Sequence, residues 1–129
     1  MRLYCFNNSY IEGIAGGVQA AHAVAELIRK YDETTPEYHA VVEWAEDHKT
    51  IIVLRAGDHD ALTSLIGVLK TGPHAWASFT EPGLNDATTS VCVVLPPKIY
   101  EHKLEADPAP LNAFDFLIVE LLSKYQLAR

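Results

Sequence analysis

The feature that most constrains the fold is a run of aliphatic residues followed directly by an amphipathic helix pattern. Residues 49–57, KTIIVLRAG, have no polar side chain in their centre, which is typical of a strand buried on both faces. Residues 57–73 then repeat leucine or isoleucine at positions 62, 65, 66 and 69, the spacing of one helical face. Asp58 or His59 can cap this helix. Because a two-sided strand needs cover on both faces, the pair predicts a layered α/β fold.

The rest of the chain supplies the other layers, in the order β-α-α-β-α-β-β-α. Strands are expected near residues 2–7, 50–55, 75–80 and 89–95, and further helices over residues 17–31, 36–46 and 112–127. In the first helix we expect an apolar, buried stripe through Val18, Ala21, Ala25 and Ile28, with Val24 and Leu27 beside it. A polar connection follows Pro97, and Asn112 is expected to cap the last helix. The sequence therefore predicts one mixed four-stranded sheet with helices on both faces and an extra C-terminal helix.

Length and charge narrow the class of protein. The 129 residues fit a single domain, 1–129, and 17 acidic against 10 basic residues give a net charge of −7. An acidic balance argues against autonomous DNA binding, and no apolar stretch is long enough to cross a membrane. The N-terminus lacks signal-peptide features. Cys5 and Cys92 lie in apolar runs, so we expect buried free thiols in a cytoplasmic protein.

Two places in the chain carry residues suited to chemistry, whereas the six scattered histidines show no metal-site spacing. In the first place, Gly16 and Gly17 precede Gln19 and His22, which are three residues apart and share a helix face. Glycine is unfavourable inside a helix, so the pair is expected where the chain turns or lies close to another group. The second place is Glu81, at the start of the loop before the last strand.

Each place also has a purely structural interpretation, as a helix edge and as a turn. Taken together they become a candidate site, because loops that leave strand ends in an open α/β sheet gather where ligands bind. A glycine-opened helix N-terminus also presents free N–H groups to an anion.

The segment Gln19-Ala20-Ala21-His22-Ala23, which follows a short strand and a glycine-bearing loop, resembles the helix-one motif of the type II peptidyl-tRNA hydrolase family. The similarity continues through HKTIIVLRAGDHDALTSLIGVL, residues 48–69, and WASFTEPGLNDATTSVCVVLPP, residues 76–97. It covers about residues 2–97 and leaves residues 98–129 as a C-terminal helical extension.

The family cleaves the ester that joins a peptide to the 3′ end of tRNA, so the resemblance implies a peptidyl-tRNA hydrolase. Carried over to this chain, it implies a catalytic set and a substrate-binding set: Glu81, His22 and Thr89 in the first, and Gly16, Gly17, Gln19 and Thr88 in the second. Glu81 stands where the family usually has an aspartate. No cofactor and no metal are expected.

The chain departs from the family in the glycine loop. Family members carry lysine just before the glutamine, one of them held to be catalytic, whereas here Ile14 or Ala15 occupies that position. Lys30, Lys49, Arg55 and Lys98 are candidates to supply the missing cation. One hypothesis is therefore a hydrolase with weak or altered activity on peptidyl-tRNA or another small anionic ligand. A second is a non-enzymatic relative acting as a binding or regulatory module, and a third is an unrelated small-ligand α/β domain.

The last helix suggests self-association. Its apolar stripe from Phe114 to Tyr125 must cover a sheet, a helix or another subunit. Because the resembled family often dimerises, we expect a homodimer in which this helix either seals the sheet or joins the interface.

Overall fold

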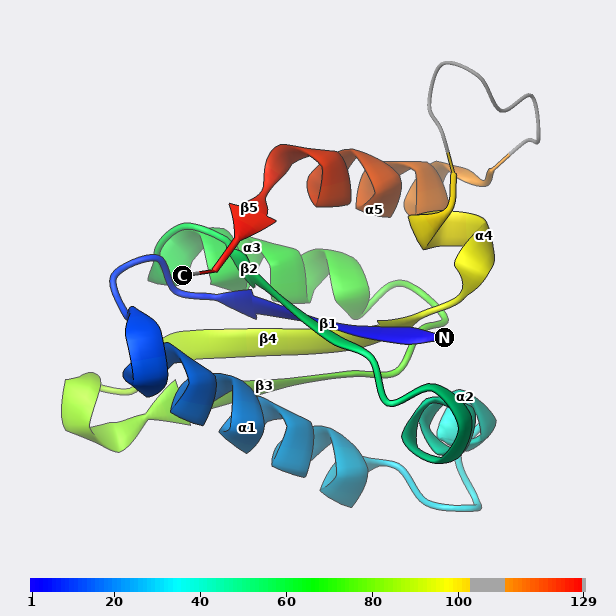
Figure 1. Ribbon diagram of the computed structural model, residues 1–129, viewed down its shortest axis with the longest axis horizontal. Coiled ribbons are helices and arrows are strands. Elements are labelled where there is room, and N and C mark those ends of the chain that lie inside the picture. The colour runs from blue at the N-terminus through cyan, green and yellow to red at the C-terminus, as the bar shows by residue number, and fades with distance from the viewer. Residues whose placement is uncertain (103–110, 129) are drawn as a thin grey trace.

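Strand β1 (Arg2–Asn7) lies in the middle of the sheet, between strands from distant parts of the chain. The computed structural model describes residues 1–102 and 111–128 (Figure 1). β1 pairs in parallel with β2 (Ile51–Arg55) and antiparallel with β4 (Ala87–Leu95). β3 (Trp76–Glu81) and β5 (Gln126–Leu127) pair antiparallel with β4 and β2 at the two edges. The strand order is β3-β4-β1-β2-β5.

The predicted α/β class and mixed sheet are confirmed, and the four expected strands lie within two residues of their predicted limits. The fifth strand, β5, was not expected. Its two residues are too few to carry an alternating pattern, and its pairing depends on α5 bringing the chain back to β2.

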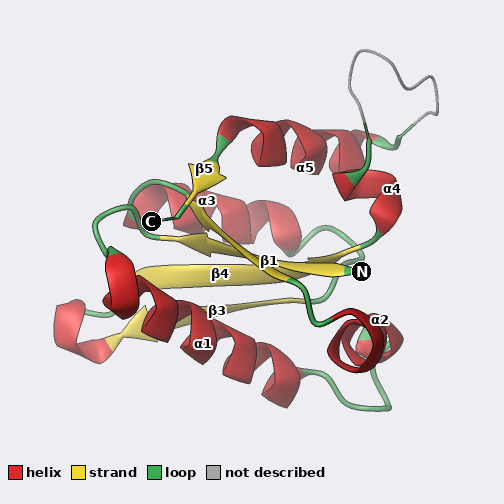
Figure 2. Ribbon diagram, in the orientation of Figure 1, coloured by secondary structure: helices red, strands yellow, loops and turns green. Residues whose placement is uncertain are grey.

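Helices cover both faces of the sheet (Figure 2). One face is covered by α1 (Gly13–Lys30), α2 (Tyr38–Glu43) and the π-helix η1 (Trp44–His48). The other face is covered by α3 (His59–Leu69), α4 (Pro97–Tyr100) and α5 (Ala113–Lys124). A short 3₁₀ turn, η2 (Pro82–Leu84), follows β3. Two predicted caps are confirmed. Asp58 accepts a hydrogen bond from Ala61 N at 3.0 Å, and Asn112 accepts one from Asp115 N at 2.8 Å.

Helix α1 differs from the prediction in both its start and its orientation. It begins at Gly13, so Gly16 and Gly17 lie inside its first turns instead of in a loop. A Cβ at Gly16 would be 3.0 Å from the Ile11 carbonyl oxygen, so this glycine permits a close approach, whereas the space around Gly17 is open. The predicted close approach is thus found at Gly16 alone.

The buried stripe expected on α1 is wrong, because a different face lies against the sheet. The side chains of Val18, Ala21, Ala25 and Ile28 are exposed, whereas Gly16, Gln19, Ala20, Ala23 and Leu27 are buried. The buried face is made mostly of small residues and therefore packs close to β4, where Cys92 Sγ donates to the Ala23 carbonyl oxygen at 3.4 Å. Both cysteines are buried and free, as expected.

The C-terminal extension covers the α3 face of the sheet. Ile118 and Val119 of α5 are buried in the same core as Leu62 and Leu65 of α3. Phe114 packs against Gly72, where any Cβ would lie only 2.0 Å from the ring. Sealing the sheet is therefore the role observed for α5. The polar connection expected after Pro97 lies largely outside the described residues, at 103–110, and no helix in the described ranges is long and apolar enough to cross a membrane.

Candidate functional site

Polar side chains gather at one edge of the sheet, where β1 and β2 end and β4 begins. β1 and β2 are parallel, so their carboxyl ends deliver Asn7 and Arg55 side by side. β4 is antiparallel to β1 and therefore starts at this same edge, and β3 ends there with Glu81. Helix α1 also begins here (Figure 1). Loops and strand ends that converge in this way form the usual ligand-binding edge of an open α/β sheet.

The structure joins three of the predicted residues in one hydrogen-bond chain. Thr89 Oγ1 donates to Gln19 Oε1 at 2.6 Å, and Gln19 Nε2 donates to Glu81 Oε2 at 3.1 Å. Because Thr89 engages the amide oxygen of Gln19, the amide nitrogen has to face Glu81. The other Glu81 oxygen accepts Gly83 N at 3.3 Å. Thr89 and Gln19 are buried and Glu81 is half-buried. The three linked side chains therefore lead from the interior to a carboxylate that solvent can reach.

His22 lies beside this chain without bonding to it. Its ring stacks on Phe79, with centroids 4.4 Å apart and planes 15° from parallel. Phe79 precedes Glu81 by two residues on β3, and His22 follows Gln19 by three on α1, so ring and carboxylate lie on the same side of α1. The stacking fixes the plane of an exposed imidazole that lies one helical turn from Gln19.

The remaining predicted residues have no hydrogen bond to the Glu81 carboxylate, although Thr88 pairs with Thr80, the residue before Glu81. The main chain of Thr88 accepts from Asn8 Nδ2 at 3.3 Å and donates to His59 Nδ1 at 2.9 Å, which ties it to the β1 loop and to α3. Gly16 O accepts from Asn7 Nδ2 at 2.9 Å. Gly16 and Gly17 both line a separate hollow of about 210 Å³ against Val53 of β2. Only Gln19, His22, Glu81 and Thr89 therefore form the candidate site.

The resemblance implies a lysine at position 14 or 15, and position 15 is the nearer of the two to the flank of Gln19. Residue 15 lies one turn before Gln19, on the flank of α1 that also carries Gln19 and His22. Ile14 is offset by a further 100° around the helix and is almost fully exposed. Ala15 is exposed and carries no charge.

None of the four candidate cations stands in for this lysine. Lys30 is at the far end of α1, Lys49 ends η1 before β2, and Lys98 Nζ is 3.2 Å from Asp115. Arg55 alone reaches the correct edge of the sheet, where its Nη2 lies 3.6 Å from the carboxylate of Glu12. Arg55 thus faces the start of α1 rather than Glu81.

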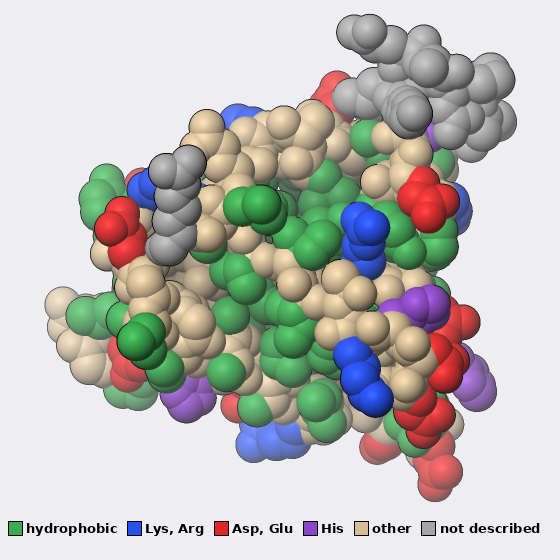
Figure 3. Space-filling model, in the orientation of Figure 1, with side chains coloured by type: hydrophobic (Ala, Val, Ile, Leu, Met, Phe, Trp, Pro, Cys, Tyr) green, Lys and Arg blue, Asp and Glu red, His purple; other side chains and the backbone are tan. Residues whose placement is uncertain are grey.

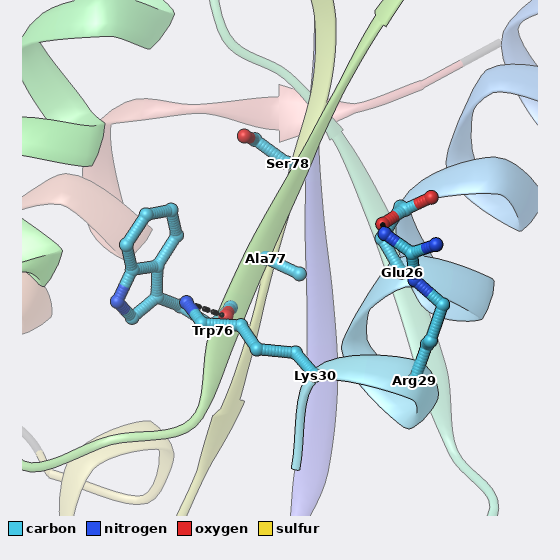
Figure 4. Close-up of a pocket in the computed structure, with 6 residues that line it drawn as sticks. All are labelled: Glu26, Arg29, Lys30, Trp76, Ala77 and Ser78. Atoms are coloured by element: carbon cyan, nitrogen blue, oxygen red, sulfur yellow. Dashed lines mark hydrogen bonds and ion pairs between the residues drawn. The ribbon is translucent and has the colours of Figure 1, made fainter.

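Lys30 is instead part of a second hollow, of about 340 Å³, between the end of α1 and β3 (Figure 4). Its Nζ donates to the Trp76 carbonyl oxygen at 2.8 Å and lies 3.5 Å above the Trp76 ring. Burial lowers the pKa of Lys30. Tyr31 OH makes two hydrogen bonds to the main chain of Trp76: it accepts from the N–H at 3.0 Å and donates to the carbonyl oxygen at 3.1 Å. These contacts cover the exposed edge of β3 and protect it from pairing with another strand.

Acidic side chains lie at both ends of the sheet. Figure 3 shows one group over α2 and η1, at the end away from the candidate site, where Glu43, Glu46 and Asp47 lie. The edge that carries Glu81 also has Glu12, Asp58, Asp60 and Asp86, against Arg55. Such a surface attracts RNA phosphates poorly.

No protein-family model matches the chain, and no curated protein matches it. Within the described residues, no three metal-ligating side chains are grouped. The hydrogen bond of Asn7 with Gly16 and that of His59 with Thr88 were not predicted from the sequence. Asn7 ends the first predicted strand and His59 follows the second by four residues. Polar residues at or soon after strand ends are the sequence signal that could have indicated both.

Proposed function

We propose that this chain is a peptidyl-tRNA hydrolase-like protein in which Glu81 activates the water that cleaves an ester. The observation that supports this most is the Thr89–Gln19–Glu81 hydrogen-bond chain. The family motif implies these residues from three separate segments, and the fold brings them together. The same function would place the protein in the cytoplasm, and we propose that it works as a homodimer.

In this mechanism, Glu81 accepts a proton from water, and the hydroxide attacks the ester carbonyl carbon. The bond to the ribose oxygen then breaks, and that oxygen takes up the proton. Gln19 and Gly83 N hold the carboxylate in one orientation, while Thr89 holds Gln19. The His22 ring, fixed by Phe79, is placed to donate a hydrogen bond to the substrate.

The absent lysine predicts slow turnover. With Ala15 on the Gln19 flank and acidic groups at the edge, nothing there neutralises RNA phosphates or a developing oxyanion strongly. We therefore expect weak cleavage of peptidyl-tRNA, or action on another small anionic ligand. The same two observations favour the second candidate, a relative of this fold that binds such a ligand without cleaving it.

The first experiment measures hydrolysis of an N-acetylated aminoacyl-tRNA by the purified chain and by Glu81→Gln. We expect Glu81→Gln to lower kcat by about 10-fold or more, because a general base typically contributes ~10²–10⁴. Glu33→Gln is the matched control, since Glu33 is exposed in the segment after α1, and it should leave the rate unchanged. Robust turnover that is unaffected at both Glu81 and His22 would show that this site is wrong.

The second experiment restores the charge. Ala15→Lys should raise hydrolysis by about 10-fold, the gain that corresponds to roughly 1.4 kcal/mol of added transition-state stabilisation. Ser64→Lys adds the same charge on the exposed side of α3, away from the site, and should not raise the rate. Equal rates for the two variants would favour the binding module. Binding is then measured directly, as retention of the N-acetylated aminoacyl-tRNA by the protein.

A further inference from the structure

We propose that two copies of this chain pair through the outer face of α1, antiparallel and about a two-fold axis at Ala21. The proposal specifies the surface of the expected homodimer and places it on α1 rather than on α5. It does not depend on the hydrolase assignment, because its evidence is the exposed surface of one helix.

The outer face of α1 is an uninterrupted apolar stripe. Ile14 is 88% exposed, Val18 46% and Ile28 56%, and the exposed Ala21 and Ala25 lie between them. The positions are separated by four, three, four and three residues, the spacing of a helix–helix seam. Residues 13–25 contain no Asp, Glu, Lys or Arg, although a solvated helix face normally carries charge. This composition is typical of a face that another helix covers.

The stripe is also self-complementary when it is reversed. About an axis at Ala21, Ile14 of one copy lies level with Ile28 of the second copy, and Ala21 meets Ala21. An isologous interface requires such a match, because each residue must fit its own symmetry mate. The small side chains at the axis allow the two helices to approach closely, with isoleucine at both ends.

Charges at the ends of α1 favour the antiparallel direction. Glu12 precedes the helix with its side chain 70% exposed, and Arg29, 81% exposed, lies in the last turn beside Lys30. Antiparallel pairing places Glu12 of one copy near Arg29 of the other. There these exposed side chains can exchange their partners within one copy, Arg55 and Glu26, for each other. Lys30 faces Trp76 and takes no part. Parallel pairing would instead bring like charges together at both ends, which is unfavourable.

The size of the stripe sets the strength of association. An 18-residue helix is about 27 Å long, so one helix pair buries on the order of 800 Å² in total, below the 1,200–2,000 Å² of stable complexes. The dimer should therefore be weak and reversible. The Gln19 and His22 flank stays beside β3, at the margin of the paired face.

The test is sedimentation equilibrium of the full chain from about 10 to 500 μM, a range suited to an interface of this size. We expect the average mass to rise with concentration from 14.3 kDa toward twice that value. Ala21→Glu should keep the chain monomeric, because it buries two carboxylates at the axis. Ser64→Glu on the exposed side of α3 is the control and should not change association. Circular dichroism checks that both variants fold.

Orientation is tested by exchanging charges. Glu12→Arg or Arg29→Glu alone should weaken association several-fold, and the double variant should recover it. A wild-type chain that stays monomeric throughout, or an Ala21→Glu variant that still dimerises, would overturn the proposal. Failure of the double variant to recover would exclude the antiparallel arrangement.

Discussion

Two carboxylates in this protein accept several hydrogen bonds each, yet their surroundings suit them to different roles. Asp115 of α5 is 1% exposed, and its oxygens lie 3.0 Å from His74 Nε2 and 3.2 Å from Lys98 Nζ. Glu81 of β3 is half-buried, and its partners are the neutral Gln19 and the main chain of Gly83. Asp115 is enclosed by basic groups, whereas Glu81 keeps access to solvent. Asp115 therefore holds elements together, whereas Glu81 stays accessible for the role proposed above.

The Asp115 cluster joins three segments on the α5 side of the sheet. His74 precedes β3, Lys98 lies on α4 and Asp115 is in the first turn of α5. Burial of Asp115 opposes its ionisation, but the hydrogen bonds and charges of His74 and Lys98 outweigh this effect and hold the pKa of the carboxyl below its ordinary value. The Asp115 carboxyl is therefore ionised in the folded protein at neutral pH.

Removing Asp115 should produce the largest effect on stability. Asp115→Ala leaves His74 buried without its partner and releases α5 from α4, so we expect a loss of about 3 kcal/mol in the free energy of unfolding. Urea denaturation measures the change. Asp60→Ala removes an exposed carboxylate from the first turn of α3 and should cost no more than about 0.5 kcal/mol. Equal losses in the two variants would contradict the role of the cluster.

Thr89→Val should have a smaller effect on stability and a distinct effect on the proposed site. The change keeps the shape of the side chain but removes the donor that fixes Gln19, so we expect a loss of about 1 kcal/mol. Gln19 can then turn away from Glu81. The carboxylate is no longer held in one orientation, so the rate of hydrolysis should decrease. Denaturation and turnover are measured on the same preparation. A stable variant with full turnover would remove Thr89 from the site.

The pH dependence of Asp115 should be the smallest effect. Because its folded pKa is below the ordinary 3.8, the carboxylate stabilises the fold above that pH and loses this contribution as pH falls from 3.8 through the lowered value. The stability difference between the wild-type chain and Asp115→Asn should therefore shrink over that window and stay constant above it. Denaturation curves at several pH values test this. A constant difference down to pH 3 would show that Asp115 is not stabilised as an anion.

The sequence predicted the strands because their signals are local, whereas Glu81 and Thr89 were given their catalytic roles through the family resemblance. β-branched runs mark the strands, and the Gln19-x-x-His22 spacing places two side chains on one flank whichever way the helix turns. The buried face of α1 was predicted wrongly because α1 carries alanine, glycine or valine on all of its sides. When both sides are apolar, periodicity cannot choose between them, and contacts with Thr89 and Cys92 on β4 decide.

The Asp115 cluster and β5 were beyond the reach of a sequence pattern for a different reason. Asp115 follows a cap residue, where an acidic side chain is common on an exposed helix start, so nothing marks it as buried. Its partners lie 41 and 17 residues earlier in the chain. Only the packing of α5 on the sheet brings these groups together.

The central position of β1 has a consequence for how the chain acquires its fold during synthesis. β1 leaves the ribosome before every strand with which it pairs, since β2 begins at Ile51 and β4 ends at Leu95. The apolar side chains of Leu3, Cys5 and Phe6 thus remain without their sheet neighbours while most of the chain is being made. Pairing across such long sequence separations is slow. Helix α1, the first element to follow β1, can cover only the face with Leu3 and Cys5, whereas the face with Phe6 has to wait for α3.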